Sequence, residues 1–80
     1  MTTQKAVALK ISNLLVKHHM TQYALCKKIA MSEATLRSII NERYNTVKLD
    51  TIILICDGFN ISLQEFFNDS LFTRENLEVE

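Results

Sequence analysis

Apolar and polar positions repeat with the period of an α-helix along the chain, most clearly over residues 21–41. The apolar positions there recur every three or four residues and form two stripes: Ala24, Leu25 and Ile29, then Leu36, Ile39 and Ile40. Too few residues separate the stripes for an ordinary loop. Ser32 stands where the second helix should begin, because its hydroxyl can accept a hydrogen bond from the first turn. The pattern predicts two short helices joined by a tight turn, each burying the stripe of the other.

The rest of the chain keeps the helical period, and no useful length shows the alternation of a β-strand. Thr2 or Thr3 can cap a first helix, and Ser62 with Glu65 forms a capping-box pattern. We predict an all-α fold of five helices at about residues 3–18, 22–30, 33–42, 49–58 and 63–67. Residues 43–47 have no apolar period and are predicted to form an exposed loop.

The fourth helix is the most apolar of the five. Its inward positions are expected to be Leu49, Ile52, Ile55 and Cys56. Gly58 and Asn60 are expected to mark its end, because both residue types favour the left-handed backbone that terminates many helices.

The length suits one small domain. The chain has 80 residues, and its longest apolar run, Ile52 to Cys56, is far too short to cross a bilayer. The N-terminus lacks the apolar core of an export signal, so we expect a soluble cytoplasmic protein. We divide the chain into a domain at residues 1–67 and an acidic tail at residues 68–80. The tail has three possible fates: it is disordered, docks on its own domain, or pairs with a second subunit.

No residues suggest a catalytic centre. Cys26 and Cys56 have no close Cys or His at zinc-ligand spacing and are expected to be buried, reduced thiols. His18 and His19 are adjacent and cannot point at one metal from one helical face. Paired carboxylates, a nucleophile with its base and a phosphate-binding glycine loop are also missing. We expect no enzyme activity, no metal, no cofactor and no small-molecule ligand.

Charge is unevenly distributed along a chain that is formally neutral. Through residue 48 there are eight basic and two acidic residues, a formal charge of plus six. From residue 49 onward there are one basic and seven acidic residues, a formal charge of minus six. A polyanion would be attracted to the first part, which holds the two short helices, and repelled by the second.

These residues together resemble the Cro/C1-type helix-turn-helix family, the lambda-repressor-like fold of phage repressors and of bacterial regulators called XRE-like. The likeness covers about residues 7–67. Its first segment holds Thr21, Gln22, Leu25, Ile29, Ser32, Leu36, Ile39 and Asn41, and its second holds residues 49–51, 55–56, 59–63 and 65–67. The resemblance implies a helix-turn-helix at helices two and three that binds double-stranded DNA.

The chain departs from the family pattern at its helix ends. Glu42 stands where the family usually has glycine, so the turn after the third helix is either built differently or strained. Ala30 occupies a second position where glycine is frequent, and Val47 replaces a common proline. Leu15 and Ile40 replace a buried Arg and Glu pair found in many relatives. Because both partners are apolar, we predict that Leu15 and Ile40 touch.

The family's mode of docking assigns roles to the third helix and its surroundings. The helix would enter the major groove with Glu33, Ala34, Arg37 and Ser38 toward the bases, where Glu33 could accept from cytosine and Arg37 could pair with guanine or phosphate. The expected phosphate contacts come from the start of the second helix and from the loop after the third: Gln22, Asn41, Arg43, Tyr44, Asn45 and Lys48.

The sequence favours a sequence-specific transcription regulator, a small repressor of phage, mobile-element or bacterial origin. A module that keeps the fold but binds a protein partner is the alternative, and the acidic Glu33 and the overall neutrality favour it. The family generally acts as homodimers on half-sites roughly 34 Å apart. Candidate dimer contacts are Phe66, Phe67, Leu71 and Phe72, although for the two adjacent phenylalanines a role in completing the core is favoured over a dimer contact.

Overall fold

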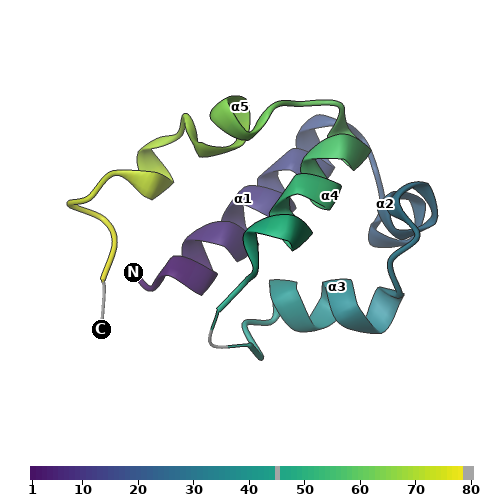
Figure 1. The fold of residues 1–80 in the computed structure, drawn as a ribbon, viewed down its shortest axis with the longest axis horizontal. Helices are drawn as coiled ribbons and strands as arrows, with labels where there is room; N and C mark the ends of the chain where they lie inside the picture. Colours follow the sequence, from purple (N-terminus) through teal and green to yellow (C-terminus); the bar gives the residue numbers. More distant parts are fainter. Residues whose placement is uncertain (45, 79–80) are drawn as a thin grey trace.

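The computed structural model describes residues 1–44 and 46–78, and within them it is all-α with five α-helices (Figure 1). The helices are α1 (Thr3–Lys17), α2 (Gln22–Ile29), α3 (Glu33–Ile40), α4 (Leu49–Phe59) and α5 (Leu63–Phe67), followed by a 3-10 turn, η1 (Ser70–Phe72). The all-α prediction is confirmed. Four C-terminal boundaries differ: α1 and α2 each end one residue early, at Lys17 and Ile29, α3 ends at Ile40 rather than near Glu42, and α4 runs one residue past Gly58 to Phe59. No helix in the described ranges is both long and apolar enough to cross a membrane.

Side-chain hydroxyls start four of the five helices, largely where the sequence predicts. The Oγ1 of Thr2 accepts from the Lys5 N–H at 3.3 Å, and the Oγ1 of Thr21 accepts from the Ala24 N–H at 3.0 Å. Ser32 begins α3 in the same way, and Ser62 with Glu65 forms the predicted capping box. These hydroxyls satisfy N–H groups that lack a partner within the helix. Lys48 begins α4 without a side-chain cap.

Four helices end on a left-handed residue that is not glycine: His19, Ala30, Glu42 and Asn60, with φ between 53° and 58°. After α3 the Glu42 N–H donates to the Ile39 carbonyl, and the Arg43 N–H donates to the Ser38 carbonyl. This is the Schellman pattern, and it recurs after α1 and α4. Glu42 therefore adopts the left-handed turn that the family usually forms with glycine at this position. A left-handed residue with a Cβ costs roughly 1–2 kcal/mol, so the turn is strained.

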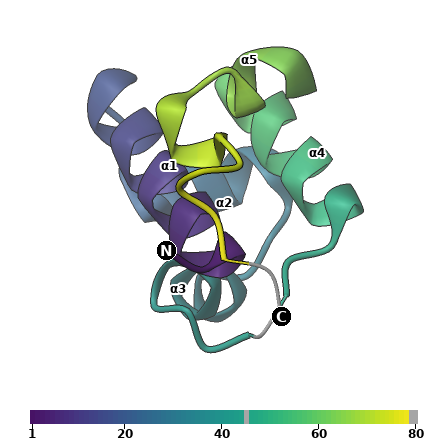
Figure 2. The same cartoon turned by 90° about the vertical axis from the view of Figure 1, so that its left-hand side faces the viewer.

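The core lies where the helices meet (Figures 1 and 2). Helix α1 packs against α3 and η1, α2 packs against α3 and α4, and α4 packs against α5. The five largest fully enclosed side chains are Ile11, Leu25, Leu36, Ile55 and Phe66. Leu15 belongs to this core cluster and Ile40 packs against it. The two residues therefore share one core, and direct contact between them stays a prediction.

Three burial predictions are wrong. Ala24 is exposed, because α2 turns Leu25, Cys26 and Ile29 toward the core. Leu49 is 56% exposed, because it opens α4 and the inward stripe begins only at Ile52. Val47 belongs to the predicted exposed loop, yet it is partly buried against the core cluster.

Gly58 lies inside α4 at the contact with α2. A Cβ built on this residue would lie 2.5 Å from the Leu25 Cδ1 and 2.7 Å from the Ile29 Cγ2. Both distances are far below normal van der Waals contact. The glycine therefore sets how closely α2 approaches α4, and it does not end the helix as the sequence suggested.

The segment after α5 docks on its own domain within the described residues. The Lys10 ammonium contacts an Asp69 carboxylate oxygen at 2.9 Å, and the Leu71 N–H donates to the other oxygen at 3.0 Å. The Leu71 N–H and the Lys10 ammonium hold the pKa of Asp69 below its usual range. Further on, Thr2 and Glu78 form an isolated parallel bridge. Figure 2 shows this segment crossing in front of α1.

We predict that Gly58→Ala destabilises the protein by about 1–3 kcal/mol, because the added methyl overlaps Leu25 and Ile29. Urea unfolding measures the change. The same substitution made in an Ile29→Ala background should cost less than in the wild type, since one overlapping group is gone. Equal costs in the two backgrounds would contradict the proposed contact.

We also predict that Glu42→Gly and Ala30→Gly each stabilise the protein by about 1 kcal/mol, because glycine adopts the left-handed backbone without strain. Thermal or urea unfolding of single variants tests this. Asn60→Gly is the matched control, since asparagine already tolerates this conformation and should gain less. A loss of stability at both Glu42 and Ala30 would show that these side chains contribute more than their backbone strain costs.

Candidate nucleic-acid interface

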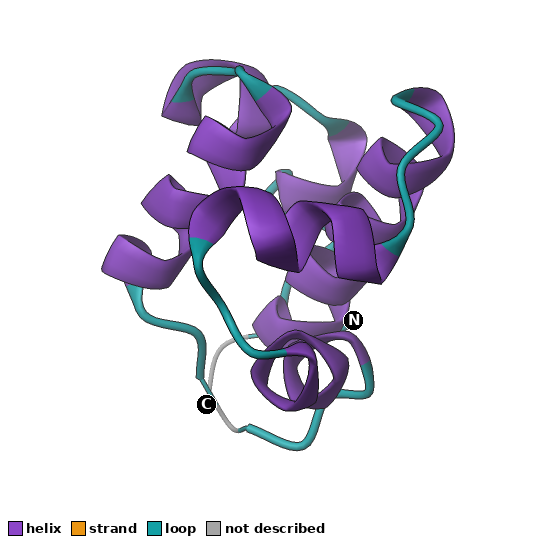
Figure 3. Ribbon diagram, turned by 90° about the vertical axis from the view of Figure 1, so that its right-hand side faces the viewer, coloured by secondary structure: helices purple, strands orange, loops and turns teal. Residues whose placement is uncertain are grey.

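Helices α2 and α3 form a compact pair joined by the turn at residues 30–32. Figure 3 faces this side of the molecule, with α2 across the front and α3 nearly end-on below it. Leu25 from α2 and Leu36 from α3 are fully enclosed in the shared core. The Met31 N–H donates to the Cys26 carbonyl at 3.1 Å, which closes the turn. The pair is therefore held rigidly by burial on one side, and its other side remains accessible.

The outer face of α3 is accessible at most of the predicted positions. Glu33, Ala34 and Arg37 are exposed, and Ser38 is half-buried. On the opposite face, Leu36 and Ile39 are buried. Helical geometry thus separates the candidate base-reading side chains from those that anchor the helix.

Glu33 and Arg37 lie one helical turn apart on this face. An Arg37 guanidinium nitrogen is 3.9 Å from a Glu33 carboxylate oxygen, and both side chains are about half exposed. An exposed pair at this distance contributes little to stability. The Glu33 carboxylate does reduce the net positive charge of this face. Because the pair is weak, the Arg37 guanidinium can leave Glu33 for another hydrogen-bond acceptor at little cost in free energy.

The predicted phosphate contacts come from two places that flank α3. Gln22 is the first residue of α2, next to the Thr21 cap, and it is half-buried. Asn41, Arg43, Tyr44 and Lys48 are exposed around the connection between α3 and α4. Asn45 lies outside the described residues.

Two features around the α2–α3 pair are missing from the sequence predictions. Tyr23 on α2 is 55% exposed, and the Lys27 ammonium lies 5.4 Å from the centre of its ring. The four-residue spacing of the two side chains could have indicated this pair. A depression of about 260 Å³ also lies beside the connection to α4, lined by Thr35, Ile39, Tyr44, Thr46, Val47, Lys48 and Thr51. Its residues come from three segments, so no local pattern predicts it.

Both cysteines are buried and free, as predicted. Burial raises the pKa of the Cys26 thiol, and the neighbouring Glu33 carboxylate adds to the rise. Burial likewise raises the pKa of Cys56, with a contribution from Asp57. Over residues 1–44 and 46–78, no three side chains of the metal-binding types gather as a metal site would require.

The dimer candidates are also placed by the structure. Phe66 is fully buried, so it belongs to the core and cannot form a dimer contact. Phe72 packs against the core cluster, and Leu71 is half-buried. Phe67 remains 37% exposed.

Two short helices at a tight turn, with one face of the second helix exposed and the other anchored, define a helix-turn-helix DNA-binding domain. Comparison with protein families agrees: the model of the Cro/C1-type HTH DNA-binding domain matches residues 10–70. The chain belongs to this family. Comparisons with curated proteins and with solved structures give no match.

Proposed function

We propose that this protein is a sequence-specific transcription regulator that reads the major groove of DNA with the outer face of α3. The observation that carries this proposal is the division of α3 into two faces. Leu36 and Ile39 fix the helix in the core, while Glu33, Ala34 and Arg37 are exposed. A helix held in this way presents side chains to the base edges without losing its position.

The base-reading roles follow from the chemistry of each side chain. The Arg37 guanidinium can donate two hydrogen bonds to guanine, and the Glu33 carboxylate can accept from a cytosine amino group. The Ala34 methyl can contact a thymine methyl, and the Ser38 hydroxyl can form hydrogen bonds with more than one type of base. Arg37 is the one residue of this set that can donate to guanine through two N–H groups, so we expect modest specificity at each half-site.

Phosphate contacts on both sides of α3 would fix its orientation. Gln22 lies at the positive end of α2, where a helix attracts phosphate. Asn41, Arg43, Tyr44, Asn45 and Lys48 would form the second group of contacts. We add Tyr23 and Lys27 to these candidates, because they form an exposed pair next to Gln22.

We further propose a small repressor that acts as a homodimer in the bacterial cytoplasm or nucleoid. One domain of this size buries too little DNA surface for tight binding alone, and a two-fold dimer doubles the contacts. Phe67 is the candidate dimer contact that keeps a substantially exposed ring. A repressor of this kind needs neither a cofactor nor enzyme activity.

A module that binds a protein partner is the alternative, and one observation favours it. The Glu33 carboxylate, 3.9 Å from Arg37, places a negative charge on the exposed face of α3 that a bound duplex, itself negatively charged, would meet. The basic first part of the chain favours DNA, because its formal charge is plus six.

Measuring affinity for mixed-sequence duplexes against salt separates the two functions. If three or so cationic side chains neutralise phosphates, the logarithm of the association constant should fall with the logarithm of salt concentration with a slope of about −3. No binding even at low salt would reject DNA binding and leave the interaction module.

Selection of binding sites from a random duplex pool tests the reading face. The selected sites should form an inverted repeat. Arg37→Ala should relax the preference at particular positions at a cost of about 1–3 kcal/mol, while Gln22→Ala should weaken all sites alike. Lys17→Ala is the matched control for Arg37→Ala, because it removes one exposed positive charge at the end of α1. An unchanged motif in Arg37→Ala would show that α3 is docked differently.

A further inference from the structure

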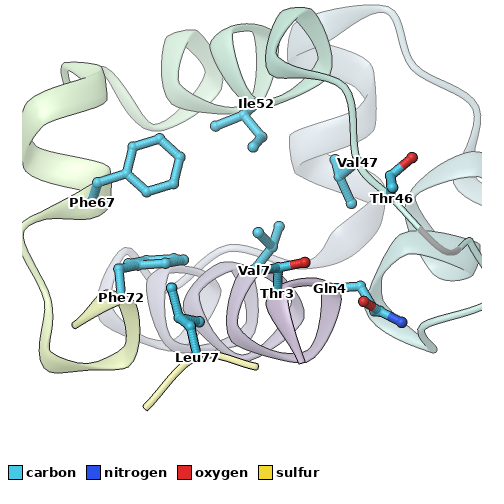
Figure 4. A pocket seen from close by; sticks show the side chains of 9 residues that line it. All are labelled: Thr3, Gln4, Val7, Thr46, Val47, Ile52, Phe67, Phe72 and Leu77. Carbon is cyan, nitrogen blue, oxygen red and sulfur yellow. The ribbon is translucent and has the colours of Figure 1, made fainter. Parts of the chain in front are cut away.

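A cavity of about 500 Å³ lies between α1, α4 and the segment that follows α5 (Figure 4). Nine residues line it: Thr3, Gln4, Val7, Thr46, Val47, Ile52, Phe67, Phe72 and Leu77. It forms because α1 and α4 each pack more closely on other helices than on one another. The volume is within the range of about 300–1,000 Å³ that is typical of small-molecule sites.

The walls of the cavity are mainly apolar and carry no charged side chain. Phe67, Phe72 and Leu77 line one end, and Thr46 and Val47 line the other; in Figure 4 Thr3 lies beside Val7 between the two ends, and the Gln4 amide and the Thr46 hydroxyl point away from the open space. The polar residues of the lining, Thr3, Gln4 and Thr46, are all neutral. An ionised ligand would lose hydration here without gaining a counter-charge, so a neutral ligand is favoured.

The aromatic wall is held in place by its surroundings. The rings of Phe67 and Phe72 meet edge to face, with their centres 4.9 Å apart. The ring of Phe66, which is fully buried, has its centre 5.7 Å from that of Phe72. The contact between Lys10 and Asp69 fastens the start of the same segment to α1. The aromatic wall of this half-open cavity is thus held by packed and hydrogen-bonded elements.

We propose that this cavity binds a neutral, mainly apolar small molecule. The proposal replaces our expectation from the sequence that the chain binds no small molecule. It does not depend on DNA binding, although Thr46 and Val47 belong to the connection that also carries Arg43 and Tyr44.

Indole is a suitable probe, because it is neutral, aromatic and carries a single N–H donor. We expect indole added to the full-length ¹⁵N-labelled protein to cause saturable chemical-shift changes that concentrate at Val7, Val47, Ile52 and Leu77. Indole-3-acetate has the same ring with a negative charge, and it should bind at least tenfold more weakly. Shifts that do not saturate, that spread over the surface, or that are equally strong for both compounds would overturn the proposal.

Two variants on the same helix provide the control. Val7→Phe fills the cavity from α1 and should weaken indole binding at least tenfold, whereas Val16→Phe lies at a position that is 76% exposed and should leave binding unchanged. Should Val7→Phe fail to fold, Thr46→Phe closes the cavity from an exposed position and should give the same loss. Undiminished binding in a folded cavity variant would overturn the proposal.

Discussion

The short length of α3 is the constraint on which the rest of the structure depends. A helix of eight residues has too few hydrogen-bonded turns to persist alone in water. It exists because Leu36 and Ile39 are buried against α1 and α2 and because Ser32 satisfies its first turn. The remaining helices therefore act as a support that keeps one small surface in a fixed orientation. The exposed face can vary in sequence while this support is kept.

Much of this support could be predicted from the sequence, because its causes are local. The positions of the hydroxyl caps and the three- and four-residue apolar spacing identify all five helices to within about two residues. The exposed face of α3 follows from the same period, since the residues opposite Leu36 and Ile39 must face outward. Whether these residues contact DNA in the assigned way stays a prediction.

The differences from prediction arise where distant segments meet. Leu49 has an apolar side chain at the right spacing, but it is the first residue of α4, where the inward stripe has not yet begun. Ala24 gains little from burial, so Leu25 and Cys26 determine the rotation of α2. The large cavity and the docked tail depend on contacts between residues far apart in the chain, such as Lys10 with Asp69. No pattern within one helix carries that information.

The single glycine of the chain lies within a helix, while four left-handed helix ends are occupied by larger residues. This reverses the usual association of glycine with bends. Added side-chain volume is accordingly less well tolerated at position 58, near the C-terminal end of α4, than at these left-handed helix ends. If homologous chains retain glycine at position 58, the reason would be the close approach of α2 to α4. Retention of that glycine would not indicate a flexible hinge in the backbone.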